Sequence, residues 1–136
     1  MARPYLGGSN ACIKAVSADT TLGVGDSGNN IIVDASTAST NFTITLPATA
    51  TSKGVSYDII CGVASHSAST VLVTSDTNIV GGTLLWSTGV VTEVASGASR
   101  GFGDSAKAGS RMHIVCDGTQ WLILNANSDV AFVASH

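Results

Sequence analysis

Charged side chains are scarce in this chain. They make up 11% of its 136 residues, against about 25% in ordinary soluble domains. Glutamate occurs once, at Glu93, and the six lysines and arginines are scattered along a chain of net charge −3. Binding to a nucleic-acid backbone requires basic side chains gathered in one footprint. We therefore expect no nucleic-acid partner.

Long apolar segments are also missing. No apolar run approaches the 18 residues that a membrane-spanning helix needs, so the sequence predicts no membrane span. The first residues, MARPYLGGSNA, lack the apolar region of a secretory signal peptide. Cysteine occurs at Cys12, Cys61 and Cys116, an odd number at wide spacing that does not predict a disulfide framework. We expect buried, reduced thiols in a protein made in a cytosol.

Helical periodicity is absent too. No segment places apolar residues at i, i+3, i+4 and i+7 over three turns, and the best candidate is a short turn at 104–108. Short segments of β-type sequence are present instead, separated by Gly, Asn, Asp and Ser. The predicted strands are residues 13–18, 30–34, 41–46, 55–61, 69–74, 83–86, 90–94, 110–116, 121–124 and 130–134.

The region 109–124 gives the clearest pattern. Met112, Ile114 and Cys116 alternate with polar residues, as expected of a half-buried strand. Asp117 and Gly118 then predict a tight hairpin, because such turns need positive φ angles. Trp121 opens the return strand.

These features predict one all-β domain, a β-sandwich of jelly-roll type, over residues 12–136. Residues 1–11 are expected to form an extended arm. No internal repeat of fixed period is visible, which disfavours a solenoid. Abundant small side chains and few charges favour an oligomer, or a chain that lies on a larger assembly.

Two glycine motifs resemble enzyme signatures but have the wrong context. Residues 23–28 match G-x-G-x-x-G, yet a strand is predicted after them, where a dinucleotide site needs a helix. Residues 97–101 match G-x-S-x-G, yet the chain offers no helix after Ser99 and no large α/β sheet. We expect neither cofactor binding nor hydrolase activity, and predict that the protein is not an enzyme.

Metal binding is not predicted either. His113 and Cys116 are three residues apart on one strand, so their side chains point to opposite faces. Most aspartates fall in predicted turns, where such side chains commonly bind the local backbone. A calcium site in a loop is the remaining alternative, although no loop has the usual density of acidic residues.

The two tryptophans have different surroundings. Trp121 is followed by Leu122, Ile123 and Leu124, which favours a place in the core. Trp86 follows two leucines beside a Ser-Thr-Gly turn. A core position and a sugar-stacking position both remain open for it.

Six short segments, spread over about two thirds of the chain, resemble a pattern in structural proteins of tailed bacteriophages. They are 26–28 (DSG), 32–34 (IVD), 43–47 (TITLP), 54–57 (GVSY), 79–82 (IVGG) and 117–121 (DGTQW). The pattern is similar to capsid decoration, or cement, proteins of marine and cyanobacterial phages, and to β-rich modules of phage tail fibres. The resemblance implies a β-sandwich, usually trimeric, fixed to the outer capsid, and it marks no catalytic residue.

A short compact chain favours the cement protein. We therefore expect a homotrimer that binds the major capsid protein on the outside of the virion, without a cofactor. The expected capsid anchor is the N-terminal arm, through Arg3, Pro4, Tyr5 and Leu6, and the expected trimer seam uses outward residues such as Val91 or Ile60. The alternative is a receptor- or glycan-binding module of a tail fibre, with Trp86 as the sugar platform.

Overall fold

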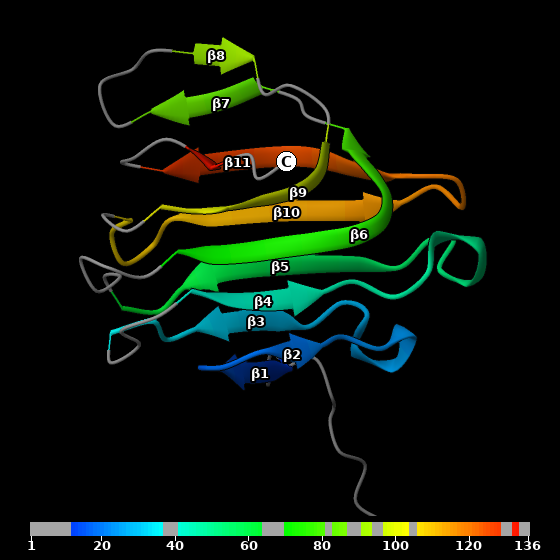
Figure 1. Ribbon diagram of the computed structural model, residues 1–136, viewed down its shortest axis with the longest axis horizontal. Helices are drawn as coiled ribbons and strands as arrows, with labels where there is room; N and C mark the ends of the chain where they lie inside the picture. The colour runs from blue at the N-terminus through cyan, green and yellow to red at the C-terminus, as the bar shows by residue number, and fades with distance from the viewer. Residues whose placement is uncertain are drawn as a thin grey trace, which may run out of the picture.

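The computed structural model of the protein describes residues 12–36, 41–63, 70–80, 83–86, 91–93, 97–103, 106–128 and 132–133. Most of these residues form β-strands, so the prediction of a single all-β domain is confirmed (Figure 1). The strands are β1 (Ile13–Val16), β2 (Thr20–Thr21), β3 (Asn30–Val33), β4 (Phe42–Thr45), β5 (Ser56–Cys61), β6 (Val71–Val80), β7 (Thr83–Trp86), β8 (Val91–Glu93), β9 (Gly97–Phe102), β10 (Arg111–Cys116), β11 (Trp121–Ser128) and β12 (Phe132–Val133).

The first six strands alternate between two layers. Strands β1, β3 and β5 lie side by side and parallel in one layer, and β2, β4 and β6 do the same in the other. The chain therefore winds through three stacked turns, and our expectation against a solenoid is wrong for this half. Ile13 pairs with Asn30, and Asn30 pairs with Asp58. The number of residues between paired positions therefore differs from one turn to the next, which explains why no fixed period is visible in the sequence.

Strand β6 joins the two layers. Its first half pairs with β4, and its end, at Ile79 and Val80, pairs with β11. Strands β10 and β11 continue the first layer by antiparallel pairing next to β5, while β9 continues the second layer next to β6. The sheet is therefore nearly closed, with β1 and β2 at one end of the stack and the β7–β8 pair at the other (Figure 1).

The core lies between the layers and follows the predicted alternation. Strands β5 and β10 each bury every second residue, and Phe42 and Ile44 of β4 are buried in the same way. Trp121 is fully buried, as predicted, and its ring stacks on Tyr57 with centroids 5.7 Å apart. Burial of alternate side chains from both layers is the main source of stability in such a domain.

The β10–β11 turn differs from the prediction. Four residues, from Asp117 to Gln120, separate the paired Cys116 and Trp121. Only Gly118 has a positive φ, of 100°. The carboxylate of Asp117 accepts hydrogen bonds from the N–H groups of Thr119 and Gln120, at 2.8 and 2.9 Å. The aspartate side chain therefore shapes this loop, in place of a two-residue turn.

Some elements have no counterpart in the sequence prediction. Strand β2 is too short to show alternation, and β9 has the uninformative sequence GASRGF. Strands β6 and β11 are longer than predicted. The predicted helical turn at 104–108 is described only from residue 106, where the chain forms a turn closed by the bond from the Ser110 N–H to the Lys107 carbonyl. No helix that could cross a membrane occurs in the described ranges.

Candidate functional site

The open edge of strand β1 is the best candidate for an interaction site. Strand β1 pairs with β3 on one side and has no partner on the other among the described strands. The carbonyls of Cys12 and Val16 accept bonds from the Asn30 and Asp34 N–H groups, at 2.9 and 2.8 Å. Because backbone groups alternate along a strand, those of Ile13 and Ala15 point away from the sheet. We call these outward groups and the Ile13 side chain the β1 edge.

The β1 edge carries an exposed apolar side chain. Ile13 is 65% exposed, more than any other large hydrophobic residue whose side chain the structure describes. Ala15 beside it is also exposed. Edge strands are commonly protected by charge, since a lysine discourages pairing with another chain.

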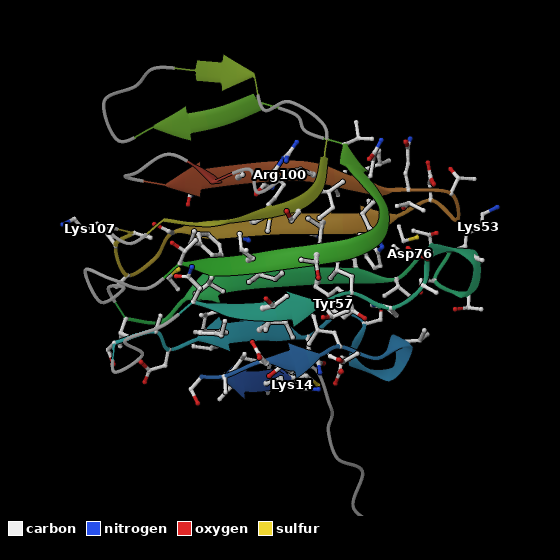
Figure 2. All side chains as sticks on the ribbon, in the orientation of Figure 1. Lys14, Lys53, Tyr57, Asp76, Arg100 and Lys107 are labelled. Atoms are coloured by element: carbon white, nitrogen blue, oxygen red, sulfur yellow. The ribbon has the colours of Figure 1, made fainter. Side chains whose placement is uncertain are left out.

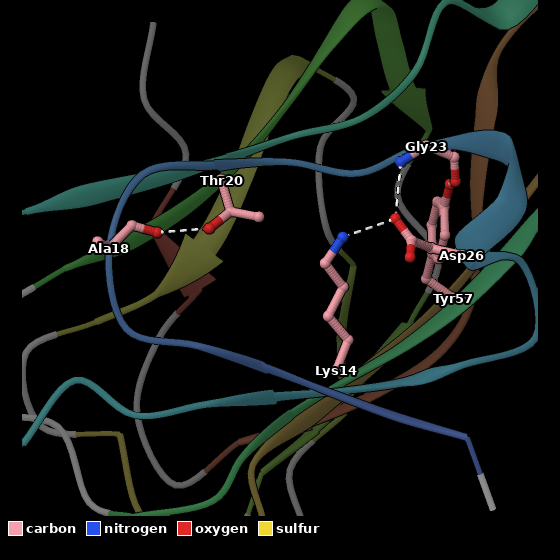
Figure 3. Close-up of polar contacts among 6 residues, drawn as sticks. All are labelled: Lys14, Ala18, Thr20, Gly23, Asp26 and Tyr57. Carbon is pink, nitrogen blue, oxygen red and sulfur yellow. Dashed lines mark hydrogen bonds and ion pairs between the residues drawn. The ribbon is translucent and has the colours of Figure 1, made fainter.

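The one lysine of β1 does not protect its edge. The ammonium group of Lys14 lies 2.8 Å from Oδ2 of Asp26, and the same oxygen accepts the Gly23 N–H at 2.9 Å (Figure 3). The Gly23 bond and the Lys14 bond together hold the pKa of Asp26 below its usual value. At neutral pH the charge of Lys14 is therefore balanced within the chain, and the β1 edge presents mainly backbone groups and Ile13.

Tyr57 fixes the turn that carries Asp26. Its hydroxyl donates to the Gly23 carbonyl at 2.5 Å, and burial raises the pKa of Tyr57 to about 12 (Figure 3). Because Tyr57 stacks on Trp121, the Val24–Asp26 turn is tied to the core. The Lys14–Asp26 ion pair in turn connects β1 to this turn.

The outer face of the first layer carries the other surface features. Arg111 of β10 forms an ion pair with Asp58 of β5, which sequence analysis did not identify. Ile60, expected in a trimer seam, is half-buried on this face. Leu124 of β11 is 58% exposed. The Arg111–Asp58 ion pair could not be predicted from the sequence, because it depends on β5 and β10 being neighbours in the sheet.

The motifs that resembled enzyme signatures are parts of the β-fold. Gly23 and Gly28 lie on either side of the turn Val24–Asp26, which contains Gly25, and the segment leads into β3. Residues 97–101 run straight through β9, with Ser99 buried. His113 is half-buried on the outer face and Cys116 is buried on the inner one, as predicted. No group of three metal-ligating side chains occurs among the described residues.

Most of the described aspartates accept hydrogen bonds from backbone N–H groups as expected, but one of them, Asp76, lies in a strand and not in a turn. Asp26, Asp34 and Asp117 accept local N–H groups. Hydrogen bonds from Ser36 and from Thr119 lower the pKa values of Asp34 and Asp117, respectively. Asp76 lies within β6 rather than in a turn, and accepts the Thr49 N–H.

The cysteines confirm the expectation only in part. All three are free thiols, and Cys61 and Cys116 are buried. Burial raises the pKa of Cys61 to about 12, so this thiol stays protonated. Cys12 is exposed, which corrects the expectation of three buried thiols. It lies immediately before β1, as the first described residue of the chain.

The expected anchor lies outside the described residues. Arg3, Pro4, Tyr5 and Leu6 precede the first described residue, Cys12, so their contacts stay a prediction. The backbones of Trp86 and Val91 lie in β7 and β8, but their side chains are not among those described. In the sequence, the expected arm, residues 1–11, directly precedes Cys12 and strand β1.

Comparison with known proteins gives no family. No protein-family model matches the chain, and no curated protein matches it significantly.

Proposed function

We propose that this protein is a structural decoration protein that binds the outside of a phage capsid as a trimer and stabilises the shell. The resemblance of six short segments supports the phage assignment. The β1 edge is the observation that supports docking, because it offers an exposed Ile13 and backbone groups that no described strand pairs with. In the sequence it closely follows residues 1–11, the expected arm. In this proposal the shell protein contacts both β1 and the expected arm, because residues 1–11 closely precede β1 in the sequence.

Strand addition is the proposed mode of binding. An extended segment of the shell protein lies along β1, and its backbone groups bond with those of Ile13 and Ala15. In such complexes main-chain hydrogen bonds provide affinity, and pockets for alternate side chains provide specificity. The arm, with Tyr5 and Leu6, continues the contact along the shell.

Stabilisation of the shell then follows from mass action. A protein that binds the assembled shell and not its free subunits shifts the equilibrium toward the shell. A trimer makes three such contacts at once, which can raise affinity about 10²–10⁴-fold without a new kind of contact. The shell then better resists the outward pressure of packaged DNA.

Co-sedimentation with undecorated capsids tests this proposal. Substitution A15P removes one outward N–H group and fills the β1 edge with a ring. We expect capsid affinity to fall roughly tenfold or more. The fold should persist, because proline is tolerated where the N–H of an edge strand faces solvent.

Deletion of residues 2–8 should abolish binding while the trimer remains.

Two matched variants distinguish docking at β1 from docking at β11. Ile13 and Leu124 are exposed apolar residues of similar accessibility, on the β1 edge and on β11 respectively. We expect I13S to weaken capsid binding and L124S to leave it unchanged. The reverse order would place docking at β11, which β3, β5 and β10 separate from β1. No capsid binding by the wild-type protein, together with binding on a glycan array, would favour the tail-fibre module.

A further inference from the structure

Arg100 is a cation in the interior of the fold. It lies on β9 in register with Val73 of β6, on the same side of its strand as the buried Phe102. Only 1% of its surface is exposed. Figure 2 labels it on β9, well away from Lys14 and the β1 edge. An arginine in such a place is unusual, since charged side chains are almost never fully buried unless they are paired.

The guanidinium of Arg100 is satisfied on one side only. Nη1 donates to the Ser99 carbonyl at 2.7 Å. Nε and Nη2 are buried, and no acceptor among the described residues lies within hydrogen-bond distance. Gly97 lies directly against the group, because a Cβ there would come within 2.8 Å of Nη1. The backbone at Gly97 therefore leaves room for the guanidinium and gives it no charge.

The described carboxylates are all engaged elsewhere. Six of the nine acidic residues have described side chains, and each accepts a hydrogen bond or forms an ion pair with another residue. They are Asp19 with Thr43, Asp26 with Lys14, Asp34 with Ser36, Asp58 with Arg111, Asp76 with Thr49 and Asp117 with Thr119. The carboxylates of Glu93, Asp104 and Asp129 belong to side chains outside this description.

A buried cation without a counter-ion is costly. Desolvation lowers the pKa of Arg100, yet an arginine remains protonated in proteins at neutral pH. Burial of an isolated charge is tolerated only when an opposite charge and hydrogen bonds compensate it. The two free donors, Nε and Nη2, form the side of the guanidinium fork that matches the two oxygens of a carboxylate.

We propose that the Nε–Nη2 side of Arg100 is a binding site for one carboxylate group, held by two parallel N–H···O hydrogen bonds. This inference does not depend on the proposed capsid function. The carboxylate has two available sources, a small carboxylate anion from solution and an acidic residue of this chain.

Thermal unfolding of the full chain tests the anion source. We compare sodium acetate with sodium chloride at equal ionic strength and pH 7, in the wild type, R100K and R100M. Binding from solution predicts that acetate raises the wild-type Tm by several degrees, with saturation. R100K should show a reduced rise, because lysine lacks the planar fork. R100M should show none.

Double-mutant cycles test the source within the chain. If the carboxylate comes from this chain, acetate has no effect on Tm and R100M lowers Tm strongly. One of the substitutions E93Q, D104N and D129N then lowers Tm in the wild type but causes little further decrease when it is combined with R100M. R100K retains the positive charge, so we expect it to fold and to serve as the reference if R100M does not fold. The proposal is overturned if acetate acts equally on wild type and R100M. It is also overturned if acetate has no effect and R100M is at least as stable as the wild type, or if acetate has no effect and none of the three acidic substitutions couples to R100M.

Discussion

Substitution of Trp121 by alanine is expected to lower the free energy of unfolding by about 3–5 kcal/mol. The ring is fully buried and stacks on Tyr57. Trp121 also pairs with Cys116 of β10 and Ile79 of β6, at the point where β6 passes from one layer to the other. Its removal leaves a cavity where both layers meet, and the rigid strands cannot close it.

Urea denaturation measures this decrease in the free energy of unfolding, and two further variants serve as references. L124A removes an exposed side chain of the same strand and should change stability by no more than about 0.5 kcal/mol. W121F should cost less than W121A, since it keeps a ring and removes an indole N–H that has no acceptor among the described residues. A W121A variant as stable as L124A would contradict the position of Trp121 in the core.

Substitution of Gly101 by alanine is expected to separate β9 from β6. A Cβ at Gly101 would lie 2.0 Å from the carbonyl oxygen of Val71 and 2.9 Å from its carbonyl carbon. These are backbone atoms of a paired strand, so no side-chain rotation relieves the overlap. We expect a loss of about 3 kcal/mol or more, at or above the usual range for overpacking.

The matched control is G25A. A Cβ at Gly25 meets nothing within 4 Å, so the substitution adds a methyl group without overlap. Denaturation curves of the two variants should therefore differ widely in midpoint. Equal midpoints would show that β9 does not approach β6 as closely as the fold requires.

Local pattern in the sequence determines much of this fold. Alternation of apolar residues in β4, β5 and β10 correctly predicts which side chains enter the core. The strong signal arises because each of these strands has one buried and one outer face. The context of the glycine motifs likewise predicts that residues 23–28 lead into a strand.

The pairing of strands could not be predicted in the same way. Parallel partners such as Ile31 and Ile59 are far apart in sequence, and turns of unequal length leave no period to detect. The β1 edge is a property of strand order, so it becomes visible only when β3 is known to cover one side alone. Buried Arg100 is hidden for a related reason, because β9 shows no alternation that would predict its inward face.

The copy number of this chain in purified virions, relative to the major capsid protein, tests the proposed function most directly. A decoration protein predicts a ratio near one. A few to a few tens of copies per particle would contradict it and place the chain on the tail or at a vertex. Absence from the particles would contradict both structural functions.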